Sequence, residues 1–167
     1  MPFSLLPKMR ADSLTDIKPD LFWERNIKLV MLDFDNTIVP YTSDEPTALV
    51  LAWLTWVKQC HVHVCVVSNS HNDRVPKFCE KYGLHCITHA KKPFSRGIRQ
   101  CLAKFNVKPA EAVLIGDQIF TDTLGANCCG VQSILIQAID NHNFWLKLRH
   151  GLEMPFILLA HKRRIHK

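Results

Sequence analysis

The chain has 167 residues, a length that favours a single domain and suffices to bury a hydrophobic core. Hydrophobic residues make up 47% and charged residues 22%, as in a typical globular protein, and no stretch reaches the roughly 20 apolar residues that a membrane span needs. The formal net charge of +6 favours a negatively charged partner: a nucleic acid, an anionic membrane surface or a phosphorylated substrate.

The seven cysteines are an odd number, and none of them forms a C-x-x-C pair. This pattern favours free thiols in a reducing compartment over a disulfide framework. The first eight residues lack the charged start and the long apolar run of a secretory signal peptide. We therefore expect a soluble or peripherally attached protein, located in the cytoplasm, on the inner face of a membrane or, in a eukaryote, inside an organelle.

Residues 1–26 are expected to be irregular, apart from a short helix that begins near Asp20. Residues 27–140 then alternate apolar runs with helical patterns and form the predicted catalytic core. The expected strands are 28–35, 61–67, 84–88, 112–115 and 131–136, and the expected helices are 48–58, 73–82, 95–105 and 121–128. This alternation is typical of β-α-β units and predicts an α/β, doubly wound, Rossmann-like domain with a five-stranded parallel sheet.

Residues 141–167 form a separate segment in which apolar side chains recur at helical spacing from Phe144 to Leu159, with basic residues around them. Pro155 should kink or split a helix there. Two interpretations stay open. The segment is either a basic amphipathic helix that lies in a membrane interface, or a helix that packs on the sheet and precedes a solvated basic tail.

Polar residues that are unsuited to a core cluster just after the first four expected strands. The stretches are Asp33-Phe34-Asp35-Asn36-Thr37, Val67-Ser68-Asn69, Lys92-Pro93 and Gly116-Asp117-Gln118-Ile119-Phe120-Thr121-Asp122. Because ligands of open α/β sheets bind beyond the carboxyl ends of the strands, we expect these stretches to share one crevice. Any one of them alone could be ordinary turn or cap chemistry.

The residue types in these stretches suit phosphoryl transfer. Carboxylate oxygens with little His or Cys nearby favour Mg²⁺, while a hydroxyl, backbone N–H groups and a lysine suit the oxygens of a phosphoryl group. An ionised aspartate beside a cation can attack phosphorus, and a second carboxyl can supply and remove protons. The four stretches together therefore indicate a phosphoryl-transfer site.

The order and type of the four stretches resemble the motifs of the haloacid dehalogenase (HAD) phosphatase superfamily, in which DxDxT comes first and GDxxxTD last. The resemblance implies that Asp33 is the nucleophile and that Asp35 is the general acid and base. It also implies a Mg²⁺ site made by Asp33, the backbone carbonyl of Asp35, and Asp117. Asp122 is expected to support this site, directly or through water.

The remaining motif positions are implied to hold the substrate. Ser68 and the backbone of Asn69 would bind phosphate, and Thr37 is assigned to the same substrate-binding set. Lys92 would steady the nucleophile and the phosphate. Lys91 is the rival for this role, but Lys92 is preferred because the family motif places its lysine directly before proline.

The gaps in which HAD phosphatases usually carry a cap domain hold only one expected helix each, so we expect an uncapped, open site and, by resemblance, the strand order 3-2-1-4-5.

The opening residues, the stretch before Asp33 and the motifs are most similar to YqeG-like, subfamily IIIA phosphatases, which include phosphatidylglycerophosphate phosphatases. That family implies an anionic phospholipid substrate at a membrane surface. The alternatives are HAD chemistry on a nucleic acid 3′-phosphate, a phosphoprotein or a small ester, and a non-enzymatic RNA- or ribosome-binding module. Nucleic acid is not the favoured partner.

Overall fold

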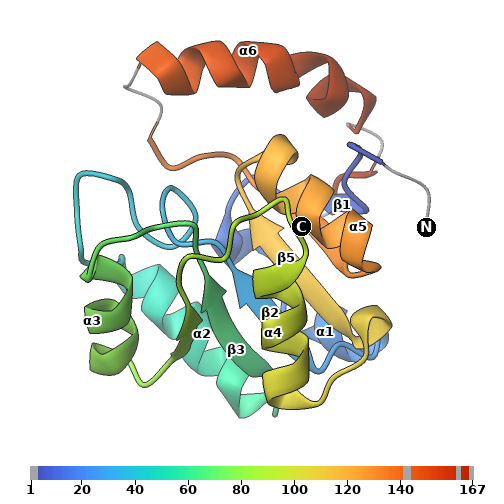
Figure 1. The fold of residues 1–167 in the computed structure, drawn as a ribbon. Helices are drawn as coiled ribbons and strands as arrows, with labels where there is room; N and C mark the ends of the chain where they lie inside the picture. The colour runs from blue at the N-terminus through green and yellow to red at the C-terminus, as the bar shows by residue number, and fades with distance from the viewer. Residues whose placement is uncertain (1–3, 141–143, 161–162, 166–167) are drawn as a thin grey trace.

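The computed structural model describes residues 4–140, 144–160 and 163–165. Its six strands are all parallel and form one sheet in the order β1-β6-β5-β2-β3-β4 (Figure 1). The strands are β1 (Met9–Arg10), β2 (Leu29–Leu32), β3 (His63–Val67), β4 (His85–Ile87), β5 (Ala112–Gly116) and β6 (Gln132–Leu135). The helices are α1 (Asp20–Glu24), α2 (Ala48–Gln59), α3 (Arg74–Lys81), α4 (Arg96–Phe105), α5 (Leu124–Cys129) and α6 (Phe144–Leu159). Short 3₁₀ turns lie at η1 (Leu14–Asp16) and η2 (Pro109–Glu111), and a π-helical turn, η3 (Ile119–Thr123), precedes α5.

The two central strands are apolar throughout because the sheet is covered on both faces. Alternate residues of β2 enter two different cores: Val30 and Leu32 belong to the cluster beneath α2 and α3, whereas Leu29 and Met31 belong to the cluster beneath α4. This alternation follows from the two-residue period of a strand. The observed layers confirm the predicted doubly wound α/β architecture.

The predicted order of the five long strands is confirmed, but the predicted strand count is wrong. A sixth strand, β1, pairs with β6 through Met9 opposite Ile134 and Arg10 opposite Leu135. Two residues are too few to show the alternation by which a strand is recognised in a sequence. On its other side, Arg10 accepts a hydrogen bond of 2.7 Å from the backbone of Ile165, near the end of the chain.

Residues before β2 contribute to the main core. Leu14, Ile17 and Phe22 are fully or almost fully buried in it. The indole Nε1 of Trp53, on α2, donates a hydrogen bond of 2.6 Å to the carbonyl of Ile17, which ties this segment to the sheet's helical layer. The predicted short helix is present as α1, which begins at Asp20.

No cap domain interrupts the described residues 4–140. The connection from β2 to β3 contains α2, and the connection from β4 to β5 contains α4 and η2. All seven cysteines are free thiols, as the sequence predicts.

The last helix, α6, crosses above the carboxyl ends of the strands in Figure 1. Pro155 lies inside it and does not split it, contrary to one of the two predicted effects. Ile157 packs with Ile119 and Leu135, whereas Leu158 and Leu159 are 64% and 67% exposed. The side chains at 144–150 and 152 lie outside the described set, so most of the predicted apolar stripe does too. None of the described helices has the length and apolar character needed to cross a bilayer.

Truncating a central strand residue tests the importance of this core. Leu114 on β5 is fully buried, so Leu114→Ala removes apolar contacts and leaves a cavity, which should lower the free energy of unfolding by about 2–5 kcal/mol. Leu49 on α2 is 71% exposed, and Leu49→Ala is the matched control, with an expected change within about 0.5 kcal/mol. Urea unfolding followed by circular dichroism measures both values, and equal losses in the two variants would contradict the assignment of the core.

Candidate active site

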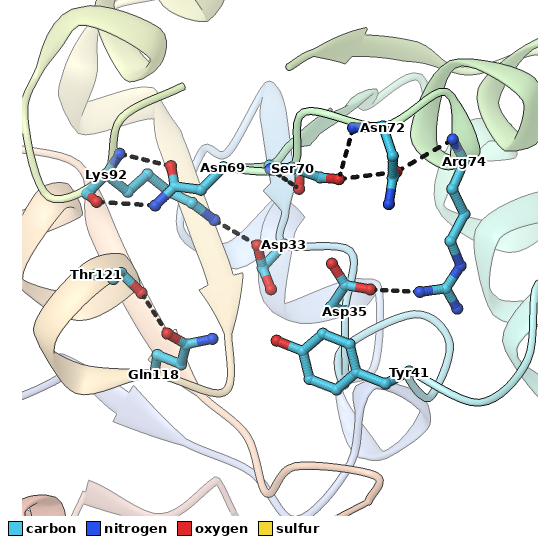
Figure 2. Close-up of a pocket in the computed structure, with 11 residues that line it drawn as sticks. Asp33, Asp35, Tyr41, Asn69, Ser70, Asn72, Arg74, Lys92, Gln118 and Thr121 are labelled. Carbon is cyan, nitrogen blue, oxygen red and sulfur yellow. Dashed lines mark hydrogen bonds and ion pairs between the residues drawn. The ribbon is translucent and has the colours of Figure 1, made fainter. Parts of the chain in front are cut away.

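The motifs that follow β2, β3, β4 and β5 converge on one cavity of about 520 Å³ at the carboxyl edge of the sheet (Figure 2). The convergence follows from the parallel strands, whose carboxyl ends all point the same way. The residues that line the cavity are Asp33, Asp35, Tyr41, Ser68, Asn69, Ser70, Asn72, Arg74, Lys92, Gln118 and Thr121.

Asp33 is held rigidly at the end of the central strand. Its backbone N–H donates to the carbonyl of Ile115 at 2.9 Å, so the β2–β5 pairing continues one residue beyond the strand. The chain then turns: Phe34 is buried against Phe78, and Asn36 takes the left-handed conformation with φ 61°. This turn separates the two acids. Asp33 points towards Lys92, and Asp35 points towards Arg74 (Figure 2).

The ammonium of Lys92 joins two acidic motifs. It lies 2.5 Å from Asp33 Oδ1 and 2.7 Å from Asp122 Oδ1, and Lys92 as a residue is only 5% exposed. Burial alone would lower the pKa of Lys92, but Asp122 and Asp33 outweigh burial and raise this pKa above its usual value. Lys92 therefore favours its protonated form beside Asp33, the expected nucleophile. The rival residue, Lys91, is exposed.

The loop that follows β3 holds the backbone of Lys92 in place. Asn69 Oδ1 accepts a hydrogen bond of 2.7 Å from the Lys92 N–H, and Asn69 Nδ2 donates one of 2.9 Å to the Lys92 carbonyl. Ser68 is 2% exposed, and its hydroxyl oxygen accepts a bond of 3.0 Å from the Ser70 N–H. The side chain of Asn69 thus positions the lysine, while Ser68 lines the cavity beside it.

Three buried carboxylates gather at the cavity, which Asp33 lines. One oxygen from each of Asp33, Asp117 and Asp122 lies within 4.8 Å of the others. Burial raises the pKa of Asp122 to about 6, although the neighbouring Lys92 opposes this change. Asp122 also sits tightly against the end of β5, where a Cβ on Gly116 would overlap its carboxylate.

This set of donors fits a hard divalent cation. Mg²⁺ prefers carboxylate and other oxygen ligands, and three buried carboxylates at so short a range repel one another unless positive charge compensates them. The residues that would hold the ion are Asp33 and Asp117, with Asp122 beside them. The side chain of Asp35 does not belong to this group, because it is ion-paired elsewhere.

Arg74 is the main site residue that sequence reasoning missed. Its guanidinium lies 2.6 Å from Asp35 Oδ1, donates to the carbonyl of Pro40 at 2.6 Å, and also contacts the carbonyl of Ser43 and the carboxylate of Asp44. It therefore fastens the loop after Asp35 around the acid. One signal was available: Arg74 is the first residue of α3, where the helix dipole disfavours a positive charge unless an acid compensates it.

The environment of Asp35 differs from that of Asp33. Burial, followed by the negative charge of Asp33, raises the pKa of Asp35, while Arg74 and Lys92 partly offset the rise. A carboxyl that holds its proton more tightly is suited to proton transfer, whereas a carboxylate paired with a permanent cation is suited to attack as a nucleophile.

One predicted substrate-binding residue does not reach the cavity. Thr37 is 1% exposed and is absent from the lining, because the turn after Asp33 folds it inward. Its N–H lies 3.3 Å from the carbonyl of Phe34 within that turn. The cavity lining also includes Tyr41 and Asn72, which lie outside the predicted stretches, and Gln118 and Thr121, which lie in the last stretch but had no role assigned to them.

Comparisons with known proteins agree with this geometry. The family model described as "Mitochondrial PGP phosphatase" matches residues 1–139. "Probable phosphatase YqeG" of Bacillus subtilis (strain 168) is 32% identical over 162 residues, which cover 96% of this chain and 94% of the relative.

Similar solved structures share the fold at low sequence identity. The hypothetical protein XCC2798 from Xanthomonas campestris has a TM-score of 0.58 at 18% identity, over 89% of this chain and 80% of that one. The cobalt-bound deoxy-D-mannose-octulosonate 8-phosphate phosphatase from Haemophilus influenzae has a TM-score of 0.55 at 14% identity, over 83% and 92% of the two chains. A HAD phosphatase from Thermococcus onnurineus has a TM-score of 0.51 at 19% identity, over 60% and 50%.

The matched region spans β1 to β6 and contains all four motifs. The family model and the YqeG relative both describe phosphatases, and the solved structures share the α/β fold. The chain therefore belongs to the mitochondrial PGP phosphatase family, is a phosphatase, and carries the four motifs in the order of the HAD superfamily.

Proposed function

We propose that this protein is a Mg²⁺-dependent phosphatase that acts through an aspartyl-phosphate and converts phosphatidylglycerophosphate to phosphatidylglycerol. The observation that carries the chemistry is the position of Asp33, which faces a cavity, pairs with Lys92 at 2.5 Å and joins Asp117 and Asp122 in a carboxylate cluster. The family description supports the substrate. The same description supports an organelle interior as the working location.

In the first step, a carboxylate oxygen of Asp33 attacks the phosphorus of the substrate. A bond forms between Asp33 and phosphorus as the bond from phosphorus to the ester oxygen breaks. Asp35 gives its proton to the departing oxygen, and the raised pKa of Asp35 suits this donation. Lys92 and the Ser68 hydroxyl line the cavity where the phosphoryl oxygens would lie.

In the second step, the ionised Asp35 takes a proton from a water molecule, and the water oxygen attacks the phosphorus. The bond between phosphorus and Asp33 breaks, which releases phosphate and restores both carboxyls. Mg²⁺, when bound, neutralises the negative charge of the phosphoryl group and so lets an anionic nucleophile approach it. Arg74 would keep Asp35 on the cavity side throughout, since it holds both the acid and the following loop.

Replacing the nucleophile tests this mechanism. Asp33→Asn removes the attacking carboxylate, so phosphate release should fall by about 10³-fold or more in the presence of Mg²⁺. The measurement is phosphate release from phosphatidylglycerophosphate in micelles, from a 3′-phosphorylated oligonucleotide and from a small phosphate ester. The phospholipid should give the highest wild-type kcat/KM.

Asp20→Asn serves as the control, because Asp20 is an exposed acid at the start of α1. Its activity should match that of the wild type. Full activity of Asp33→Asn would show that the nucleophile is assigned wrongly. A higher kcat/KM on the oligonucleotide or the small ester would show that the substrate is assigned wrongly.

The pH dependence should respond to Arg74. Because the guanidinium lowers the pKa of Asp35, Arg74→Met should raise that pKa further, and Asp35 would then keep its proton to higher pH. The alkaline limb of the pH profile of kcat should therefore move to higher pH. Lys77→Met, which removes an exposed cation of the same helix, is the control and should leave the limb in place. If the alkaline limb does not move in Arg74→Met, the ionisation that produces this limb is not that of Asp35.

We also infer that the protein contacts anionic membranes peripherally, where its phospholipid substrate would be found. Leu158 and Leu159 form an exposed apolar pair on α6, and Ile157 anchors the other side of the helix. Exposed leucines can enter the headgroup region, and the positive net charge would attract an anionic surface.

The double variant Leu158→Gln, Leu159→Gln should bind anionic vesicles about tenfold or more weakly than the wild type, because it lacks the two apolar side chains that would be buried in the membrane interface. Trp23→Gln is the control, since Trp23 is 83% exposed but lies on α1, at the opposite end of the sheet from α6 (Figure 1). Vesicle sedimentation at low and high salt measures the binding, and salt should weaken it. If the double variant binds vesicles as well as the wild type, these leucines of α6 do not contribute to membrane binding.

A further inference from the structure

The carboxylate of Glu153 contacts the segment between the two acids of the last motif. Glu153 lies on α6 and is 2% exposed. Its Oε1 accepts hydrogen bonds from the backbone N–H groups of Ile119, at 3.0 Å, and Phe120, at 3.3 Å. These are the first two residues of η3, whose N-cap position, Gln118, provides no side-chain cap. Glu153 therefore supplies from a distant helix the acceptor that the beginning of a helix lacks.

The position of this contact matters because η3 connects two members of the carboxylate cluster. Asp117 precedes it and Asp122 lies within it. Inside the turn, the Asp122 N–H donates to the Gln118 carbonyl at 3.1 Å, and Asp122 Oδ2 accepts from the Gln118 N–H at 3.2 Å. These local bonds set the shape of the turn, whereas Glu153 fixes it relative to α6.

Apolar contacts also hold α6 against η3. Ile119 is fully buried with Ile157 and Leu135, and the rings of Phe120 and Phe156 meet edge to face with centroids 6.3 Å apart. A buried carboxylate is costly unless charge-assisted hydrogen bonds compensate it, so these packing contacts alone do not account for an acid at position 153. The backbone N–H groups of Ile119 and Phe120 provide hydrogen bonds of this kind.

We propose that Glu153 is a positioning residue for the metal site: it holds η3 so that Asp117 and Asp122 keep the spacing that a divalent cation needs. This inference rests on the proposed metal-dependent function. Glu153 lies beyond residues 1–139, which the family model matches, so the contact links the matched catalytic region to a helix outside it. Residues that orient metal ligands typically change metal affinity or activity by 10- to 100-fold when they are replaced.

The test compares Glu153→Ala, which removes both acceptor contacts, with Glu153→Gln, which keeps an oxygen at the same place. Glu80→Ala is the matched control, because Glu80 is an exposed acid on α3. The full chain is used throughout. Mg²⁺ affinity is measured by calorimetry, amide hydrogen exchange is measured across 117–123, and kcat and KM are measured on a small phosphate ester.

Glu153→Ala should bind Mg²⁺ about tenfold or more weakly, exchange its amides at 119 and 120 faster, and lose kcat with little change in KM. Glu153→Gln should recover most of the metal affinity and of the protection, and it also serves as the folded comparison if the alanine variant unfolds. Unchanged Mg²⁺ affinity in a folded Glu153→Ala, or in both variants, overturns the positioning role while the proposed function stands. A wild-type protein that binds no divalent cation overturns both.

Discussion

The ion pairs of Lys92 are the interaction on which the rest of the site depends. One ammonium, almost without access to water, bridges Asp33, the proposed nucleophile at the end of β2, and Asp122, which follows β5. Removing a charge from water is costly, so the arrangement is stable only while both carboxylates face the ammonium at hydrogen-bonding distance. The parallel sheet meets this requirement by ending neighbouring strands at one level, and Asn69 meets it by clamping the lysine backbone from both sides.

Two further side chains, which come from different helices, hold the segments around this centre. Arg74 approaches from α3 and controls the loop that follows Asp35, partly by lying over the Phe34 ring at 5.1 Å. Glu153 approaches from α6 and controls the turn that carries Asp122. Asp33, the proposed nucleophile, is thus fixed by the central strand, whereas the groups around it are fixed by long-range contacts. An active site of this kind can keep a constant chemical centre while its surroundings differ among relatives.

Sequence reasoning reached the parts of this structure that are encoded locally. The apolar run before Asp33 identified the central strand, and polar residues after successive runs identified the site edge. It failed where the signal lay in contacts between distant segments. β1 is too short to show periodicity, Arg74 binds carbonyls more than 30 residues away, and Thr37 has the motif's residue type but a buried position. Glu153 likewise has its backbone partners more than 30 residues away along the chain.

The pairing of Arg10 has a consequence for how copies of this protein behave beside one another. An unpaired strand edge offers a row of free N–H and carbonyl groups to any neighbouring chain, and long edges of this type promote aggregation. Here β1 covers the edge of β6 with only two residues, the backbone of Ile165 covers Arg10 in turn, and the opposite edge, β4, is only three residues long. β1 and the backbone of Ile165 therefore cover this edge of the sheet, and they leave few free backbone groups to which a strand of another copy could pair.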